Sequence, residues 1–169
     1  MADKPAELGP DIWDVSLEGK LVVIGLGNPY MMDDGIGLQV AKELRHRDLG
    51  GGVLVFEYQT LELSLLCQFR GASKIIVVDA LRSGGSPGTV STYAIAPRDG
   101  PLLDLPSLHS LQLYDMFDLA SLSATLPCPV TIIGVEPLNC SPGEGLTEPV
   151  SAAINQAVDA VVRALGNGS

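Results

Sequence analysis

Two aspartates and one histidine are the residues of this chain whose types and positions best suit chemistry. Asp34 follows the apolar run at 21–24, Asp79 ends a second apolar run, and His109 opens a predicted helix after a loop. Two carboxylates and an imidazole form a plausible three-ligand set for a divalent metal, which leaves coordination positions open for a substrate or water. These three residues are therefore the candidate metal ligands and the candidate catalytic groups.

The turn between the first apolar run and Asp34 is rich in glycine. Gly25 and Gly27 permit a tight turn and let a backbone or a ligand approach closely. A dinucleotide site would need three glycines at a fixed spacing and a helix N-terminus open to phosphate. Because Asp33 and Asp34 occupy this region instead, the turn is suited to a cation or another positive group.

Each candidate residue also has a simpler structural interpretation. An aspartate at the end of a strand is commonly a turn former or a helix cap, and a lone histidine is commonly a capping or partly buried residue. The other histidine, His46, lies in an Arg-His-Arg sequence near the end of a predicted helix, where we expect a solvated surface role. The metal-site hypothesis therefore depends on Asp34, Asp79 and His109 being brought together.

Other catalytic motifs are absent from the sequence. It contains no Gly-x-Ser-x-Gly, no His-Glu-x-x-His and no Walker loop. Cys140 follows the last predicted strand, but nothing near it in the sequence suggests an activated thiol. Cys67, Cys128 and Cys140 are odd in number and form no Cys-x-x-Cys, so we expect reduced, mostly buried cysteines.

A mostly parallel sheet must position the candidate residues. Short apolar runs rich in β-branched residues predict about five strands, at 21–24, 53–57, 74–79, 89–95 and 129–135. Apolar residues at helical spacing predict helices at 36–47, 61–69, 109–122 and 147–165. Thr147 is the predicted N-cap of the last helix, with Pro149 in its first turn. The alternation predicts a single-domain, three-layer α/β/α sandwich, which binds ligands at the carboxyl ends of its strands.

The composition is that of a compact acidic protein. Of 169 residues, 46% are hydrophobic and 18% are charged, as in one globular domain. Ten basic and twenty acidic residues give a net charge of −10, which argues against nucleic acid as a partner. No apolar run approaches the ~18 residues of a membrane span. We expect a cytoplasmic protein without a membrane partner, in which residues 1–20 are a loosely packed tail and 21–169 the domain.

Six motifs follow one another along the chain. They are Gly25-Leu-Gly27-Asn28 with Asp33-Asp34-Gly35-Ile-Gly37, Ile76-Val-Val-Asp79-Ala80, Pro87-Gly88-Thr89, His109 before a Leu-rich helix, Gly134-Val-Glu136-Pro137 and Gly145-Leu-Thr147. Over about residues 21–165 this pattern resembles the hydrogenase maturation endopeptidases. That family trims the C-terminal extension from the large subunit of nickel–iron hydrogenases. The resemblance implies a sheet between helix layers and an endopeptidase activity.

The resemblance also implies what the candidate residues bind. Asp34, Asp79 and His109 would complete the coordination of nickel that the precursor already carries, so we expect no organic cofactor and no tightly bound metal in the protease itself. Nickel would fix the scissile peptide beside the catalytic groups. Since no standard nucleophile is evident, attack by water is the simplest account, with Asp33, Asp34 or Asp79 as the base. The expected partner is the large-subunit precursor, and the expected active form is a monomer.

Two places depart from the family pattern. Asp34 stands where the family often has glutamate, so keeping a ligand distance of about 2 Å would need a backbone shift or a water molecule. The stretch Glu57-Tyr58-Gln59-Thr60 stands where the family often has an Asp-Gly-Gly-Thr-like turn. The second departure leaves open the local substrate contact and the particular hydrogenase that is served.

Other functions fit parts of the sequence. Gly25-Leu-Gly-Asn-Pro29 also resembles the start of bacterial peptidyl-tRNA hydrolase, but that family continues with a Thr-Arg-His-Asn motif, and a tRNA-binding enzyme should have a basic surface. A non-catalytic metal-binding or client-binding maturation factor would use the same three ligands. Another peptidase, such as a spore-germination protease, could use the same fold. Release of a fragment from a precursor would distinguish an endopeptidase from a binding protein.

Overall fold

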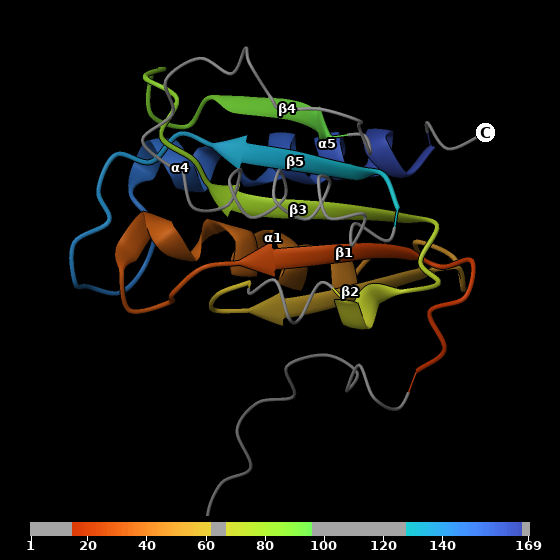
Figure 1. Cartoon of the computed structure of the whole chain (residues 1–169). Helices are drawn as coiled ribbons and strands as arrows, with labels where there is room; N and C mark the ends of the chain where they lie inside the picture. Colours follow the sequence, from red (N-terminus) through yellow and green to blue (C-terminus); the bar gives the residue numbers. More distant parts are fainter. Residues whose placement is uncertain (1–14, 62–66, 96–127, 167–169) are drawn as a thin grey trace, which may run out of the picture.

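In the computed structural model, which describes residues 15–61, 67–95 and 128–166, the chain forms a five-stranded sheet of order β2-β1-β3-β5-β4 (Figure 1). The strands are β1 (Leu21–Leu26), β2 (Val53–Tyr58), β3 (Lys74–Ala80), β4 (Val90–Ile95) and β5 (Val130–Val135). All neighbours are parallel except β4, which pairs antiparallel with β5. The five predicted strands and the mostly parallel sheet are confirmed.

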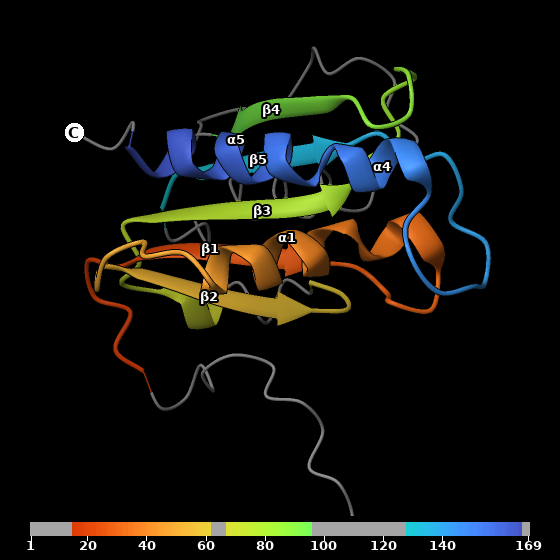
Figure 2. The ribbon, with the colours of Figure 1, turned by 180° about the vertical axis from the view of Figure 1, so that it is seen from behind.

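The described helices lie on one face of this sheet (Figure 2). They are α1 (Ile36–Arg45), α4 (Glu148–Ala152) and α5 (Ile154–Gly166). Two short 3-10 turns are also described: η2 (Met32–Gly35) leads into α1, and η3 (Cys67–Phe69) precedes β3. The helices predicted at 36–47 and 147–165 are therefore confirmed, the second with a break at Ala153. The helix predicted at 109–122 lies outside the described residues, and so does most of the one predicted at 61–69.

Both faces of the sheet are buried along its inner strands β1, β3 and β5. Successive strand residues point to opposite faces, and in β1 Val22 and Val23 are both fully buried, in two different hydrophobic clusters. The cluster on the helix side includes Val40 and Leu44 of α1 and Val158 of α5. Continuous apolar strands with two buried faces are typical of a parallel sheet between layers. The sequence predicted this α/β arrangement, in which α1, α4 and α5 supply the described helix layer.

Helix α1 lies unusually close to the sheet because two glycines face one another. A Cβ atom on Gly37 would lie 2.2 Å from the carbonyl oxygen of Leu26 and 2.3 Å from that of Val78. A Cβ atom on Gly25 would lie 2.2 Å from the carbonyl oxygen of Gly37. The close approach predicted for Gly25 is thus confirmed. It holds the start of α1, and η2 before it, directly over the ends of β1 and β3.

Residues 15–20 pack against the domain. Leu17 is only 6% exposed and belongs to the same hydrophobic cluster as Phe69. The backbone N–H of Gly19 donates to the carbonyl of Gly71 at 2.8 Å. Residues 1–14 lie outside the described part of the chain, so the domain division at residue 20 stays a prediction. Among the described helices, none is long and apolar enough to cross a membrane.

Candidate active site

Asp34 and Asp79 come together at the carboxyl edge of the sheet. Asp34 lies in η2, which follows β1, and Asp79 lies one residue before the end of the adjacent parallel strand β3. Both side chains are partly buried. Burial, and next to it the negative charge of Asp34, raise the pKa of Asp79 to about 7. The two candidate carboxylates therefore share one electrostatic environment, although 45 positions separate them in the sequence (79 − 34).

The turn after β1 fixes the carboxylate of Asp34. Its Oδ2 accepts a hydrogen bond of 2.7 Å from the backbone N–H of Asn28. Gly27 makes this possible because its φ is +140° and a Cβ atom there would lie 1.8 Å from the carbonyl oxygen of Asp34. Asn28 in turn accepts the N–H of Tyr30 through its side-chain oxygen at 3.0 Å. The glycine turn predicted from the sequence is thus confirmed as the support of the first candidate acid.

Asp33 is fully buried and has a different environment. Its Oδ1 accepts the N–H of Thr147 at 2.7 Å, and its Oδ2 accepts the Thr147 hydroxyl and the N–H groups of Leu138 and Asn139, each at 2.9 Å. Burial raises the pKa of Asp33, but these four hydrogen bonds together lower it below the ordinary value of 3.8. The side chain is therefore ionised near neutral pH and links η2 to the loop 136–147.

Thr147 was predicted as the N-cap of the last helix, and the structure corrects the reason. Thr147 does occupy the position before α4, with extended backbone angles, but its side chain makes no capping hydrogen bond. Its hydroxyl is engaged by Asp33 instead. A local sequence pattern cannot predict a hydrogen bond between residues 114 positions apart. The only signal in the sequence is that Thr147 belongs to the Gly145-Leu-Thr147 motif.

The backbones of η2 and the loop 136–147 are also paired. The N–H of Met32 donates to Gly143 at 3.0 Å, and the N–H of Gly143 donates to Tyr30 at 2.9 Å. The N–H of Asp33 donates to Asn139 at 3.0 Å. Met32 has a φ of +45°, a left-handed conformation that is unfavourable for this residue type and that the paired loop sustains. The two loops thus behave as one unit beside the acids.

A second buried carboxylate shapes the loop after β3. Glu136 is 7% exposed, and its Oε2 accepts the N–H of Ser83 at 2.6 Å, the Ser83 hydroxyl at 2.8 Å and the N–H of Gly85 at 3.4 Å. The residue belongs to the Gly134-Val-Glu136-Pro137 motif. Its task in the structure is to hold the turn that follows Asp79.

Cys140 is the partly buried thiol at this end of the sheet. Burial raises its pKa, the positive charge of Arg82 and a hydrogen bond with that side chain oppose the rise, and the charges of Asp34 and Asp33 add to it. The net direction is upward, which keeps the sulfur as a thiol near neutral pH. Cys128 is buried, and burial raises its pKa to about 11. Neither cysteine has the environment of an activated nucleophile, in agreement with the sequence analysis.

His109 lies outside the described residues, so the third candidate ligand stays a prediction. Within the described ranges, no three His, Cys, Asp or Glu side chains form a group that could hold a metal ion. His46 is exposed just after α1, in keeping with the surface role expected for it. The described part of the site is therefore a pair of carboxylates, supported by two tied loops.

Comparison with known proteins decides the family of this fold and site. The family model described as hydrogenase maturation protease, HycI, matches residues 38–164. This chain belongs to the hydrogenase maturation proteases. The hydrogenase 2 maturation protease of Escherichia coli K12 is 28% identical to it over 148 residues, which are 86% of this chain and 90% of that protein. The hydrogenase expression/formation protein HupD of Rhodobacter capsulatus is 30% identical over 156 residues, 86% of this chain and 71% of that protein.

Solved structures support the same family. The hydrogenase maturating endopeptidase HybD from E. coli matches this protease with a TM-score of 0.71 and 28% identity, over 87% of this chain and 92% of that one. The hydrogenase 2 maturation peptidase from Thaumarchaeota archaeon SCGC_AB-539-E09 matches with a TM-score of 0.66 and 30% identity, over 87% and 98%. The predicted family, fold and peptidase activity are confirmed.

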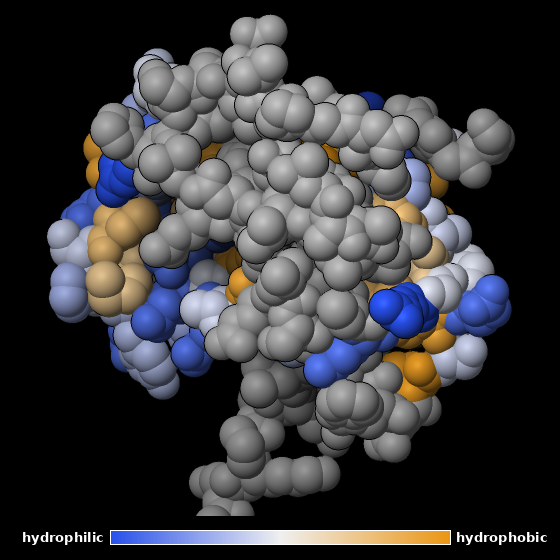
Figure 3. Space-filling model, in the orientation of Figure 1, coloured by the Kyte–Doolittle hydropathy of each residue, from blue (hydrophilic) through white to orange (hydrophobic). Residues whose placement is uncertain are grey.

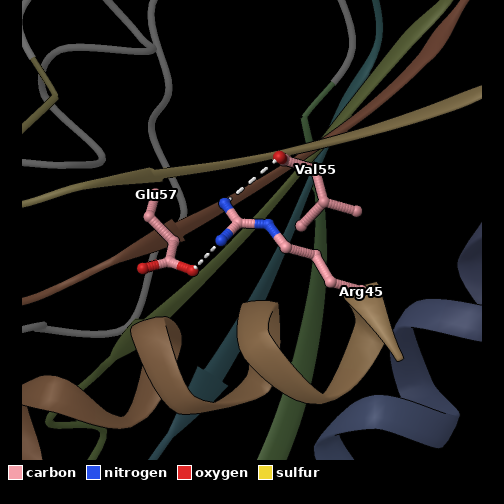
Figure 4. Close-up of polar contacts among 3 residues, drawn as sticks. All are labelled: Arg45, Val55 and Glu57. Atoms are coloured by element: carbon pink, nitrogen blue, oxygen red, sulfur yellow. Dashed lines mark hydrogen bonds and ion pairs between the residues drawn. The ribbon is translucent and has the colours of Figure 1, made fainter. Parts of the chain in front are cut away.

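The departure of this protease from the family pattern at 57–60 has a structural counterpart. The Glu57 carboxylate faces α1 and forms an ion pair of 2.5 Å with Arg45, while Arg45 also donates to the carbonyl of Val55 at 3.4 Å (Figure 4). The Glu57 side chain is only 5% exposed. At this position the protease therefore has an acid that is already engaged within the fold.

Proposed function

We propose that this protease removes the C-terminal extension of a nickel–iron hydrogenase large-subunit precursor after nickel insertion, and that the inserted nickel is its recognition element. The observation that carries the proposal is the proximity of Asp34 and Asp79, close enough for the charge of Asp34 to raise the pKa of Asp79. Two carboxylates that repel one another at the edge of a sheet gain stability when a divalent cation comes between them. A substrate that carries such a cation would be favoured over one that does not.

The nickel belongs to the substrate in this proposal. Asp34 and Asp79 would supply oxygen ligands, and His109 would supply a nitrogen ligand, as the family resemblance implies. The protease then needs no organic cofactor and no tightly bound metal of its own. Because Oδ2 of Asp34 accepts the N–H of Asn28 at 2.7 Å, the other oxygen of that short side chain would be the ligand offered to the metal, directly or through a water molecule.

The carboxylates also suit the hydrolysis step. A water oxygen attacks the carbonyl carbon of the scissile peptide, its proton passes to a carboxylate, and that proton then goes to the leaving amine as the C–N bond breaks. We assign the base role to Asp34 or Asp79. Asp33 is fully buried with both oxygens occupied, so it would act by holding the turn beside Asp34.

The experiment that tests the proposal is intact-mass analysis of a hydrogenase precursor incubated with the protease. We expect loss of one defined C-terminal peptide from the nickel-loaded precursor and no loss from the nickel-free form. Asp34→Asn, Asp79→Asn and His109→Ala should each slow cleavage by at least about a hundredfold. Cleavage of nickel-free precursor at the same rate would contradict the role of nickel.

The chain offers matched controls for these variants. Asp159 is an exposed carboxylate on α5 that lies 3.7 Å from Arg47, and His46 is the exposed second histidine. Asp159→Asn and His46→Ala should leave the cleavage rate unchanged. Stable complex formation without cleavage by the wild-type protein would instead favour a binding factor. The proposal includes the cytoplasm as the compartment and a monomer as the active form. Sedimentation of the free protein tests the oligomeric state.

A further inference from the structure

Large apolar side chains are exposed at the same end of the molecule as the acids. In the described part of the chain, Tyr30 is 64% exposed, Leu138 is 54% exposed and Val162 is 41% exposed. Single exposed apolar residues are ordinary on protein surfaces. Tyr30 and Leu138 differ from Val162 because they flank the candidate site, on the turn after β1 and the loop after β5.

These two loops are joined by hydrogen bonds. The carbonyl of Tyr30 accepts the N–H of Gly143 at 2.9 Å, and the N–H of Leu138 donates to Oδ2 of Asp33 at 2.9 Å. Met31 and Met32, both partly exposed, follow Tyr30 directly. We call Tyr30, Met31, Met32 and Leu138 the apolar rim. Figure 3 shows hydrophobic surface bordered by hydrophilic residues at the end of the molecule where β1, β3 and β5 terminate.

The apolar rim borders Asp79 on two sides. In the sheet, β3 lies between β1 and β5, so the loops that follow β1 and β5 stand on either side of the strand end that carries Asp79. A polypeptide whose scissile bond reaches Asp34 and Asp79 comes close to these loops. Methionine side chains adapt to irregular partners, and a tyrosine contributes a large contact area at low entropic cost.

We propose that the apolar rim binds the segment of the precursor polypeptide next to the scissile bond, through apolar side chains of that segment. The proposal rests on the proposed function and names a substrate contact of the same site. Charge favours this occupant over a second copy of the chain, because two molecules of net charge −10 would bring their acidic ends together. It also disfavours an anionic lipid surface, whereas a nickel-bearing polypeptide supplies a complementary cation.

The test is a steady-state comparison of Tyr30→Ser, Leu138→Ser and the double variant with the matched control Val162→Ser. All four remove an exposed apolar side chain, but only Val162 lies on α5, away from the rim. With nickel-loaded precursor as substrate, we expect KM to rise about threefold for each single rim variant and about tenfold for the double variant. The kcat value should stay within about twofold, and Val162→Ser should match the wild type.

A binding measurement separates this proposal from the proposed function. The affinity of each protein for the nickel-loaded precursor is measured in an Asp79→Asn background, in which cleavage is expected to be at least about a hundredfold slower. One outcome is that the wild-type protein releases no peptide while the double rim variant, in the Asp79→Asn background, binds the nickel-loaded precursor about tenfold more weakly than Asp79→Asn alone. That result would contradict the proposed cleavage but support binding of the precursor by the apolar rim. The proposed binding role of the apolar rim would be wrong if the double variant kept its affinity for the precursor, or if Val162→Ser lost as much affinity. It would also be wrong if the wild-type protein formed a dimer that the rim variants convert to a monomer.

Discussion

The carboxylate of Asp33 accepts both polar hydrogens of Thr147, the backbone N–H at 2.7 Å and the hydroxyl at 2.9 Å. This pair joins the turn before α1 to the loop before α4. Because Asp33 is fully buried and neighbours Asp34 in the chain, the pair also holds the first candidate acid against the rest of the sheet edge. A buried charge of this kind is tolerated only when its oxygens are fully hydrogen-bonded.

The first prediction concerns the Thr147 hydroxyl. Thr147→Val keeps the shape and the backbone N–H but removes one donor to a buried charge, so the free energy of unfolding should fall by about 1–2 kcal/mol. Thr147→Ser keeps the hydroxyl and should lose less than half as much. Denaturant unfolding monitored by circular dichroism measures both. A valine variant as stable as the wild type would show that Asp33 does not need this bond.

The strands and the glycine turn were predictable because their causes are local. Buried β-branched runs, such as the one at 74–79, need only their own sequence to indicate a strand between two apolar layers. Gly25 signals a close approach because no other residue leaves enough room, and the space it leaves is filled by the backbone of Gly37. Asp34 and Asp79 could be placed together because parallel strands end at one edge.

The tasks of the polar residues around the acids were not predictable in the same way. Asp33 and Thr147 are each compatible with a helix start, and only the fold decides that they bind one another across 114 residues. The same holds for Glu136, whose oxygen binds Ser83 from another strand end. The ion pair of Glu57 with Arg45 likewise depends on how α1 lies on β2. A local sequence pattern indicates which polar residues could form such contacts, but their partners depend on how distant parts of the chain pack together.

A second prediction follows from the raised pKa of Asp79. The pKa of this group is about 7 in the folded protein and 3.8 ordinarily, so the folded state binds its proton more tightly. Its stabilising contribution is complete below about pH 4 and is lost as the pH rises to 7. Allowing for partial exposure, the loss is of the order of 1–3 kcal/mol.

Asp79→Asn provides the measurement. The difference in free energy of unfolding between Asp79→Asn and the wild type should move in favour of the variant as the pH rises from about 4 to about 7. Asp159→Asn, which changes an exposed carboxylate, should show no such trend. Parallel stability profiles for Asp79→Asn and the wild type would mean that Asp79 is not held in a charge-excluding environment.

A third prediction tests the close approach of α1 to the sheet. Gly37→Ala would put a Cβ atom 2.2 Å and 2.3 Å from the backbone carbonyl oxygens of Leu26 and Val78, so α1 must move outward. We expect a loss of about 2–3 kcal/mol despite the better helix propensity of alanine. Cleavage should fall as well, because η2 and Asp34 precede α1. Gly166→Ala, where nothing lies within 4 Å of the new Cβ, is the control and should be neutral or slightly stabilising.

The fourth prediction concerns the ion pair between Arg45 and Glu57. Arg45→Met leaves the Glu57 carboxylate, which is 5% exposed, without its partner, so the loss of stability should be about 2–4 kcal/mol. Replacing both residues removes the buried charge, so the Arg45→Met/Glu57→Met double variant should regain most of that loss. Thermal and denaturant unfolding of the two single variants and the double variant complete the cycle. If the losses in free energy of unfolding of the two single variants add up to that of the double variant, the two side chains do not stabilise one another.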